Sequence, residues 1–220
     1  MITELDWAGI ITAVGALIGA IGGIYSIWAN FHQEEKNKMT DWKIEQYRKQ
    51  EKKRGFRRAE NTGKVLGELS QVMISTGADR VYIVQPHPLG HIAFLSIQFE
   101  VKARGVQGMR MEVQKLEMSE VPQFSKMMAE KLFMYFDDID NQMEDRVAKS
   151  LLSSNGTVAA AIKRLNSSRD WVGSIFCEFM EAPTKSREEI QKALHDAAIN
   201  IQYNLPEFQE EKNPAGALKL

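Results

Sequence analysis

The most restrictive feature of the chain is an uncharged stretch of about 25 residues near its N-terminus, from Trp7 to Phe31. At about 1.5 Å per residue, a helix over Ala8 to Trp28 would reach roughly 31 Å, which matches the hydrocarbon thickness of a bilayer. Trp7, Tyr25 and Trp28 place amphipathic rings at the two ends of that helix. A cleaved signal peptide fits less well, because the residues before the apolar run are acidic. The sequence therefore predicts a transmembrane anchor over residues 1–32.

The charge on either side of the anchor predicts its orientation. Ten Lys and Arg residues lie between residues 36 and 58, and none precedes the apolar run. The positive-inside rule then places the N-terminus outside and the rest of the chain in the cytoplasm, as a single-pass protein of the inner (plasma) membrane. We expect Lys36, Lys38 and Lys43 to contact lipid headgroups. Interspersed acidic residues leave open the alternative of a solvated helix held by i,i+4 ion pairs.

A ladder of glycines within the anchor indicates self-association. Gly15, Gly19 and Gly23 are spaced four residues apart, so they share one helix face. Small residues at this spacing let two membrane helices approach closely. We therefore expect a homodimer or a higher homo-oligomer.

The overall composition excludes several other classes of protein. The chain has 28 basic and 29 acidic residues, so its net charge does not favour nucleic acid, and no nucleic-acid-binding motif accompanies the basic segment. The single cysteine, Cys177, cannot form an internal disulfide. We expect it to be a buried structural thiol.

Residues 33–75 predict a basic helical connector, because the segment has no proline and is rich in Lys, Arg, Glu and Gln. Three glycines in its second half argue against one unbroken rod. An apolar stripe at alternating three- and four-residue steps predicts a packed face, formed by Ala59, Thr62, Leu66, Leu69 and Met73.

Residues 76–205 predict an α+β domain whose antiparallel sheet is flanked by helices. We expect a strand at Val81–Gln85, ended by a Pro-His-Pro-Leu-Gly loop, then a clear strand at Leu95–Ala103 and a weaker one at Met109–Gln114. Helical spacing follows from Pro122 to Phe136 and from Asp140 to Leu152. A hairpin of Val158–Leu165 with Trp171–Met180 precedes a last helix, which Ser186 and Glu189 begin with a capping box. Residues 206–220 should form a loosely ordered tail.

Three short motifs of this domain resemble those of GAF domains. Gly77-Ala78-Asp79-Arg80 leads into Val81–His87 as the opening GAF strand does, Val121-Pro122 precedes a helix, and Trp171-Val172-Gly173 resembles the closing strand. The resemblance covers about residues 64–204. It implies a GAF-like fold and a sensory module that holds a cyclic nucleotide, a tetrapyrrole or another small molecule, or that dimerises and relays a signal.

The sequence departs from that family where a ligand would bind, because His87-Pro88-Leu89-Gly90 replaces the expected His-Asn-Gly. We expect His87, His91 and Arg104 at the rim of any ligand pocket. The two histidines are separated by Pro and Gly, so we predict no metal site there. The residues specify no cofactor.

We predict no enzymatic activity, because no nucleophile, base and orienting group stand together in the sequence. An acidic cluster is assigned to capping the helix near residue 140; it contains Asp137, Asp138, Asp140, Glu144 and Asp145. A GAF-like reductase of methionine sulfoxide would need several cysteines, and this chain has one.

Together these features predict a membrane-tethered, non-enzymatic sensor or protein-interaction module of signal transduction, which self-associates through its anchor and connector. Its expected partners are the lipid bilayer, further copies of itself, and a small-molecule ligand or another protein. The alternative is a membrane-permeabilising, holin-like lysis protein with a cytoplasmic regulatory domain. The glycine-rich helix permits both hypotheses.

Overall fold

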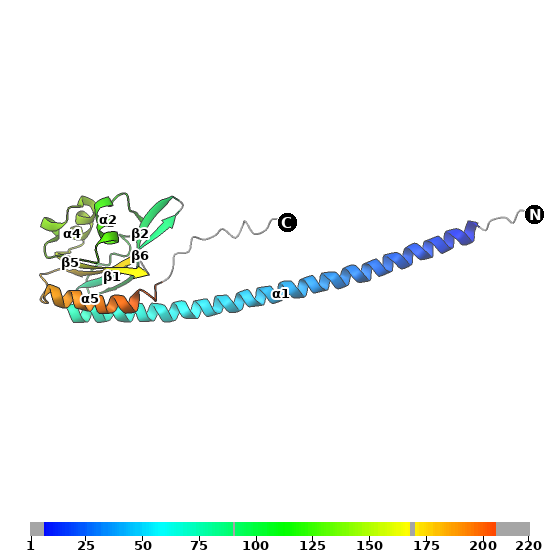
Figure 1. Cartoon of the computed structure of the whole chain (residues 1–220), viewed down its shortest axis with the longest axis horizontal. Coiled ribbons are helices and arrows are strands. Elements are labelled where there is room, and N and C mark those ends of the chain that lie inside the picture. The colour runs from blue at the N-terminus through cyan, green and yellow to red at the C-terminus, as the bar shows by residue number, and fades with distance from the viewer. Residues whose placement is uncertain (1–6, 90, 168–169, 206–220) are drawn as a thin grey trace, which may run out of the picture. The chain divides into compact units, whose positions relative to one another are not determined.

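The computed structural model describes residues 7–89, 91–167 and 170–205. The chain divides into two compact units, Met1–Arg57 and Arg58–Leu220. Helix α1, Trp7–Thr76, has residues in both units and continues without interruption through Gly55, Gly63 and Gly67 (Figure 1). The predicted tail, residues 206–220, lies outside the described residues.

In the first unit the described side chains of α1 face solvent. The aromatic rings of Trp28, Trp42 and Tyr47 are each more than half exposed. Trp28 stacks on His32 with 5.1 Å between the ring centroids, and Glu45 forms an i,i+4 ion pair with Lys49 at 2.7 Å.

Among the described residues, no helix has an apolar stretch long enough to cross a membrane. Most apolar side chains of the predicted anchor, including those of Ile10, Leu17 and Ile21, lie outside the described positions. The side chains of Lys36 and Lys38 also lie outside them. The anchor and its headgroup contacts stay predictions.

In the second unit, the described residues form a six-stranded sheet in the order β3-β2-β1-β6-β5-β4, with every neighbouring pair antiparallel. The strands are β1 Arg80–Leu89, β2 Ile92–Lys102, β3 Leu116–Glu117, β4 Phe133–Phe136, β5 Ala159–Ser167 and β6 Asp170–Phe179. The α+β class with an antiparallel sheet is therefore confirmed. The predicted β5–β6 hairpin is present, and β2 coincides closely with the predicted strand.

The helices described in this unit are α2 Pro122–Glu130, α3 Ile139–Gln142, α4 Arg146–Ser154 and α5 Arg187–Ile201. The last three begin at side chains that accept hydrogen bonds from free backbone N–H groups, whereas Val121 before α2 makes no such bond. Asp138 caps α3 and Asp145 caps α4, which confirms the predicted capping role for these two residues of the acidic cluster. The predicted capping box of Ser186 and Glu189 begins α5.

Two apolar clusters lie on opposite faces of the sheet, because successive strand residues point to opposite sides. Along β1, Val81 and Ile83 pack against α1 and α5, whereas Tyr82 and Val84 face α2 and α4. Figure 1 shows α5 beside the C-terminal part of α1 on one side of the sheet and α2 and α4 on the other.

The packed face of α1 is offset from the predicted stripe. Val65, Leu69 and Val72 are at most 2 % exposed, while Leu66 and Met73 are only partly buried. Both stripes share Leu69, and a rotation of the helix about its axis separates them. The prediction was therefore right about an amphipathic face but wrong about its centre.

The predicted loop at residues 86–90 is wrong for its first four residues, because β1 continues through Pro86 and Pro88 and pairs with β2 as far as Leu89. β6 pairs with β1 only up to Val84. The prolines therefore lie where β1 has one neighbour, and there a missing N–H donor is tolerated.

Three further predictions are corrected. Residues 109–114 form turns instead of a strand: the N–H of Val113 donates to the carbonyl of Met109, and Met111 is 84 % exposed. The helix expected from Pro122 to Phe136 ends at Glu130 and is followed by β4, and the helix expected at 140–152 is divided into α3 and α4.

Candidate functional site

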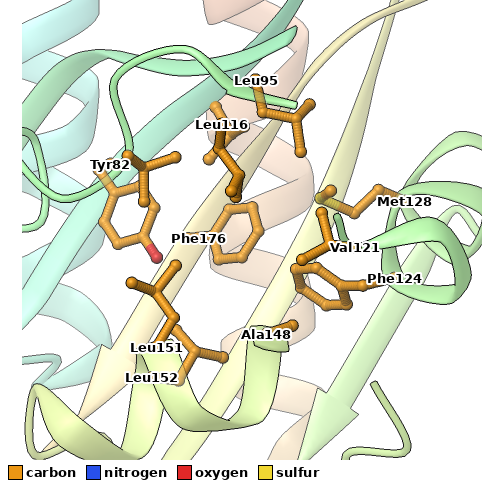
Figure 2. A pocket seen from close by; sticks show the side chains of 12 residues that line it. Tyr82, Leu95, Leu116, Val121, Phe124, Met128, Ala148, Leu151, Leu152 and Phe176 are labelled. Carbon is orange, nitrogen blue, oxygen red and sulfur yellow. The ribbon is translucent and has the colours of Figure 1, made fainter. Parts of the chain in front are cut away.

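An apolar cavity lies between the sheet and helices α2 and α4. Its wall is formed by β1, β2 and β6 on one side and by α2, α4 and the segments preceding α2 on the other; the lining residues are Tyr82, Val84, Leu95, Val113, Leu116, Val121, Phe124, Met128, Ala148, Leu151, Leu152 and Phe176. Figure 2 shows these side chains converging around Phe176. Of the twelve, only Tyr82 carries a side-chain oxygen or nitrogen.

The cavity is small, with a volume of about 30 Å³. A pocket for a drug-sized ligand or a cofactor usually measures about 300–1,000 Å³. Aromatic packing occupies the space: Phe176 stacks on Tyr82 at 4.9 Å between centroids and meets the ring of Phe124 edge-on at 6.0 Å. A nucleotide-sized molecule could enter only if these side chains moved.

A buried polar network adjoins the cavity through Tyr82. Arg80 and Glu178 are fully buried and form an ion pair, and the hydroxyl of Tyr82 donates a hydrogen bond to the Glu178 carboxylate. The same carboxylate accepts a hydrogen bond of 2.9 Å from the Thr157 hydroxyl. Arg80 also donates to the carbonyl of Gln107 at 2.5 Å, so the network joins β1, β6 and two loops.

The environment of Tyr82 limits its chemistry. Burial, followed by the charge of Glu178 and the hydrogen bond to it, raises the pKa of Tyr82 well above its usual value. The hydroxyl is therefore protonated and engaged with Glu178. This polar group is not available as a base, and it orients β1 against β6.

The residues predicted to bind a ligand do not line this cavity. His87 lies in β1, stacks on Phe94 and hydrogen-bonds through Nε2 to the hydroxyl of Ser96 at 2.8 Å. His91 and Arg104 are exposed, the first between β1 and β2 and the second in the turn after β2. The structure does not bring the three together, and their role in ligand binding stays a prediction.

The residues predicted to act in the membrane belong to the first unit. Gly15, Gly19 and Gly23 are exposed in α1, and nothing lies within 4 Å of where a Cβ would stand at each. Lys43 is exposed on the same helix. Among the described residues, no group of three or more His, Cys, Asp or Glu side chains is placed to hold a metal ion.

Cys177 lies on the sheet face that packs against α1 and α5, opposite Phe176, as the strand pattern predicts. The thiol is fully buried, and burial raises its pKa to about 12. Its sulfur lies 3.4 Å from the hydroxyl of Thr76, the last residue of α1. The predicted structural thiol is confirmed, and it joins β6 to the end of α1.

The network of Arg80, Thr157 and Glu178 was not predicted from the sequence. One signal was available, since Glu178 is a charged residue within the apolar stretch 175–179 of β6, and such a residue needs a buried partner. Its partner lies 98 residues earlier in the chain. No local pattern could have paired the two.

No protein-family model matches the chain, and no curated protein matches it. Solved structures do. GAF3 from Slr1393 of Synechocystis sp. PCC6803, in its photoproduct state, is 12% identical, with 64% of this chain and 90% of that chain covered and a TM-score of 0.54. The cyanobacteriochrome receptor PixJ is 11% identical, with 66% and 96% covered and a TM-score of 0.52.

A third similar structure is the PixJ GAF domain of Thermosynechococcus elongatus in its blue-light absorbing form, at 12% identity. The match covers 66% of this chain and 86% of that chain, with a TM-score of 0.50. At such low sequence identity, the structural likeness shows a similar fold. The second unit of this chain therefore has a GAF-like α+β fold.

Proposed function

We propose that this protein is a membrane-tethered, non-enzymatic module of signal transduction that self-associates and relays a signal through its GAF-like domain. The observation that carries the proposal is helix α1. One helix contains both the predicted anchor and the residues Val65, Leu69 and Val72, which are buried in the core of the GAF-like unit. If α1 changed its association with other copies, the packing of Val65, Leu69 and Val72 in that core would change too.

The filled cavity favours a protein-interaction role over the binding of a nucleotide or tetrapyrrole. A volume of about 30 Å³ accommodates one or two water molecules, and its apolar walls offer water few partners. A large ligand would have to displace Phe124, Met128 and Phe176 from dense packing, which is costly. On this side of the sheet the domain therefore serves as a packed scaffold.

A short chain of contacts supports communication between the two faces of the sheet. Phe176 lines the cavity, its neighbour Cys177 contacts Thr76, and Thr76 in turn donates a hydrogen bond of 2.7 Å to the carbonyl of Val72 in α1. A partner that displaces α2 or α4 would thereby shift the end of α1.

The membrane location rests on the uncharged stretch and on the basic residues that follow it. In this proposal the N-terminus lies outside the inner (plasma) membrane, and the GAF-like domain is cytoplasmic. Lys36, Lys38 and Lys43 contact lipid headgroups, with each basic residue near the surface contributing about 1 kcal/mol. The partners are the bilayer, other copies of the chain, and a protein bound by the domain.

Fractionation of cells that express the full chain tests the tether. We expect the protein to stay in the membrane pellet after alkaline carbonate extraction, and we expect a chain that starts at residue 33 to be released. External protease should leave the GAF-like domain intact in sealed spheroplasts. Release of the full chain by carbonate would refute the anchor, and digestion of the domain would refute the orientation.

A further inference from the structure

A second cavity lies on the side of the sheet that α1 and α5 cover, and its chemistry is unlike that of the first. It is a polar cleft of about 440 Å³ between α1, β2, Arg110 and the residues just after α5. Its volume is within the range of small-molecule sites. All the residues that line it belong to the second unit.

A β-bulge in β2 shapes one wall of the cleft. The pairing of β1 with β2 passes from Phe99 to Ile97, which leaves Gln98 as the extra residue. In a regular strand, consecutive side chains point to opposite faces, yet Gln98, Phe99 and Glu100 all line this cleft. Bulges of this kind redirect a side chain and recur beside functional sites.

Two arginines give the cleft its positive charge. Arg58 of α1 and Arg110 of the segment after β2 both line it, and among the described residues neither guanidinium has an ion-pair or hydrogen-bond partner. Asn61, Thr62 and Gln98 add neutral groups that can donate hydrogen bonds.

The one carboxylate in the lining is already engaged. The two oxygens of Glu100 accept hydrogen bonds from the backbone N–H groups of Met109 and Arg110, at 2.5 and 3.3 Å. Gly108 lies so close that a Cβ there would stand 2.8 Å from Glu100 Oε2. Glu100 therefore holds the segment that carries Arg110 against β2, and the two guanidinium groups remain available for an anion.

We propose that this cleft binds a small soluble anion that bears phosphate or carboxylate groups, with Arg58 and Arg110 as its charged contacts. Guanidinium groups pair with both kinds of oxyanion through parallel hydrogen bonds. The amides of Asn61 and Gln98 contact the polar remainder of the ligand, and Phe99 and Leu66 supply an apolar floor. The site lies on the opposite side of the sheet from the filled cavity and does not depend on the proposed function.

Calorimetric titration of the full chain tests the site, with pyrophosphate and citrate as probes at constant ionic strength. An uncharged detergent keeps lipid phosphate out of the sample. We expect one of the two anions to bind, and we expect Arg58→Ala and Arg110→Ala each to weaken its binding about tenfold or more. Arg110→Lys keeps the charge but not the planar fork, so its loss should be smaller.

The matched control is Arg146→Ala, which removes the same charge from an exposed position at the start of α4, outside the cleft. It should bind the probe as the original chain does, and thermal melting should show that all variants are folded. Gly19→Ile, which alters only the predicted anchor, should also bind the anion normally. A failure of the proposed self-association can therefore be distinguished from a failure of the anion site. The proposal is overturned if neither anion binds, if the cleft variants bind normally, or if Arg146→Ala weakens binding as much as they do.

Discussion

At the scale of single residues, the second unit depends on buried polar groups with fixed partners. Arg80 and Glu178 are each 0 % exposed, so each charge has lost its water. Their mutual contact and the hydrogen bonds from Tyr82 and Thr157 compensate for this loss. Removing Arg80 or Glu178 alone should therefore destabilise the fold more than replacing both with apolar residues.

Replacing the carboxylate alone should be strongly destabilising. Glu178→Ala leaves the Arg80 guanidinium buried without its counterion, so we expect the unit to lose about 3–5 kcal/mol of stability. The double variant Arg80→Met with Glu178→Leu should recover much of that loss. Thermal unfolding of the full chain measures both, and a double variant no more stable than Glu178→Ala would contradict this account.

The Cys177 thiol should not react in the folded protein. Its pKa of about 12 leaves almost no thiolate at pH 8, and the side chain is fully buried. Because the chain has one cysteine, labelling with a thiol-specific reagent reports on this position alone. Stoichiometric labelling should require denaturant; rapid labelling in buffer would show that β6 opens readily from α1.

His87 should make stability depend on pH in one direction. Partial burial, followed by the charge of Lys115, lowers the pKa of His87 below its usual value of 6.5. The N–H of Lys115 donates to the hydroxyl of Ser96, whose proton can then be donated to neutral His87. The unfolded chain therefore takes up this proton first as the pH falls, and the folded state loses stability below about pH 6.5.

Melting temperatures between pH 7.5 and pH 5 test the effect. His87→Gln should lose less stability over this range than the original chain does, whereas a variant of the exposed His195 on α5, His195→Gln, should follow the original chain. Equal pH dependence in all three would refute the assignment to His87.

At the scale of elements, the sequence predicts what is local and misses what is short or paired at long range. The β5–β6 hairpin and α5 follow from alternation and from a capping box, both visible within a few residues. Strand β4 has four residues, and its apolar side chains fit the helical spacing of α2, so the pattern concealed it. The prolines of β1 led to the wrong prediction of a loop. A strand can contain them here only because β6 stops pairing with β1 at Val84, and the sequence does not show where that pairing ends.

The candidate sites were less predictable than the elements. Val113, Phe124 and Phe176 meet in the cavity although they belong to separate parts of the chain, and Arg58 reaches the same cleft as Gln98. No spacing rule links these positions, because only the packing of helices on the sheet brings them together. The bulge at Gln98 also depends on the register of β1.

Two glycine-to-alanine variants compare the effect on stability of a new methyl group at a closely packed position and at an open one. At Gly173 in β6, a Cβ would stand 2.8 Å from the carbonyl oxygen of Val84 in β1. Gly173→Ala must therefore separate two central strands, and we expect a loss of about 1–3 kcal/mol. Gly67→Ala meets nothing within 4 Å and lies inside α1, so it should stabilise the chain by about 0.5–1 kcal/mol.

Thermal unfolding of the full chain distinguishes the two variants, because the melting temperatures should move in opposite directions. A Gly173→Ala protein as stable as the original would show that β1 and β6 can separate at little cost.

At the scale of the whole molecule, the proposal is that α1 assembles the chain in the membrane. Gly19→Ile places a bulky side chain in the middle of the glycine ladder and should weaken self-association. Ala13 stands outside the four-residue repeat of the ladder in the sequence, so Ala13→Ile is the matched control. A membrane two-hybrid assay should lose signal with the first variant and keep it with the second; an unchanged signal for Gly19→Ile would refute the ladder.

The two prolines of β1 have a consequence for how densely such chains can be clustered. Pro86 and Pro88 are two residues apart, so both missing N–H groups belong to one side of the strand, and β2 pairs along the other side as far as Leu89. The open side of β1 beyond Val84 thus offers few donors to a strand from another molecule. Crowded copies of this protein should therefore not join their sheets along this part of β1, because it gives an incoming strand too few donors to bind.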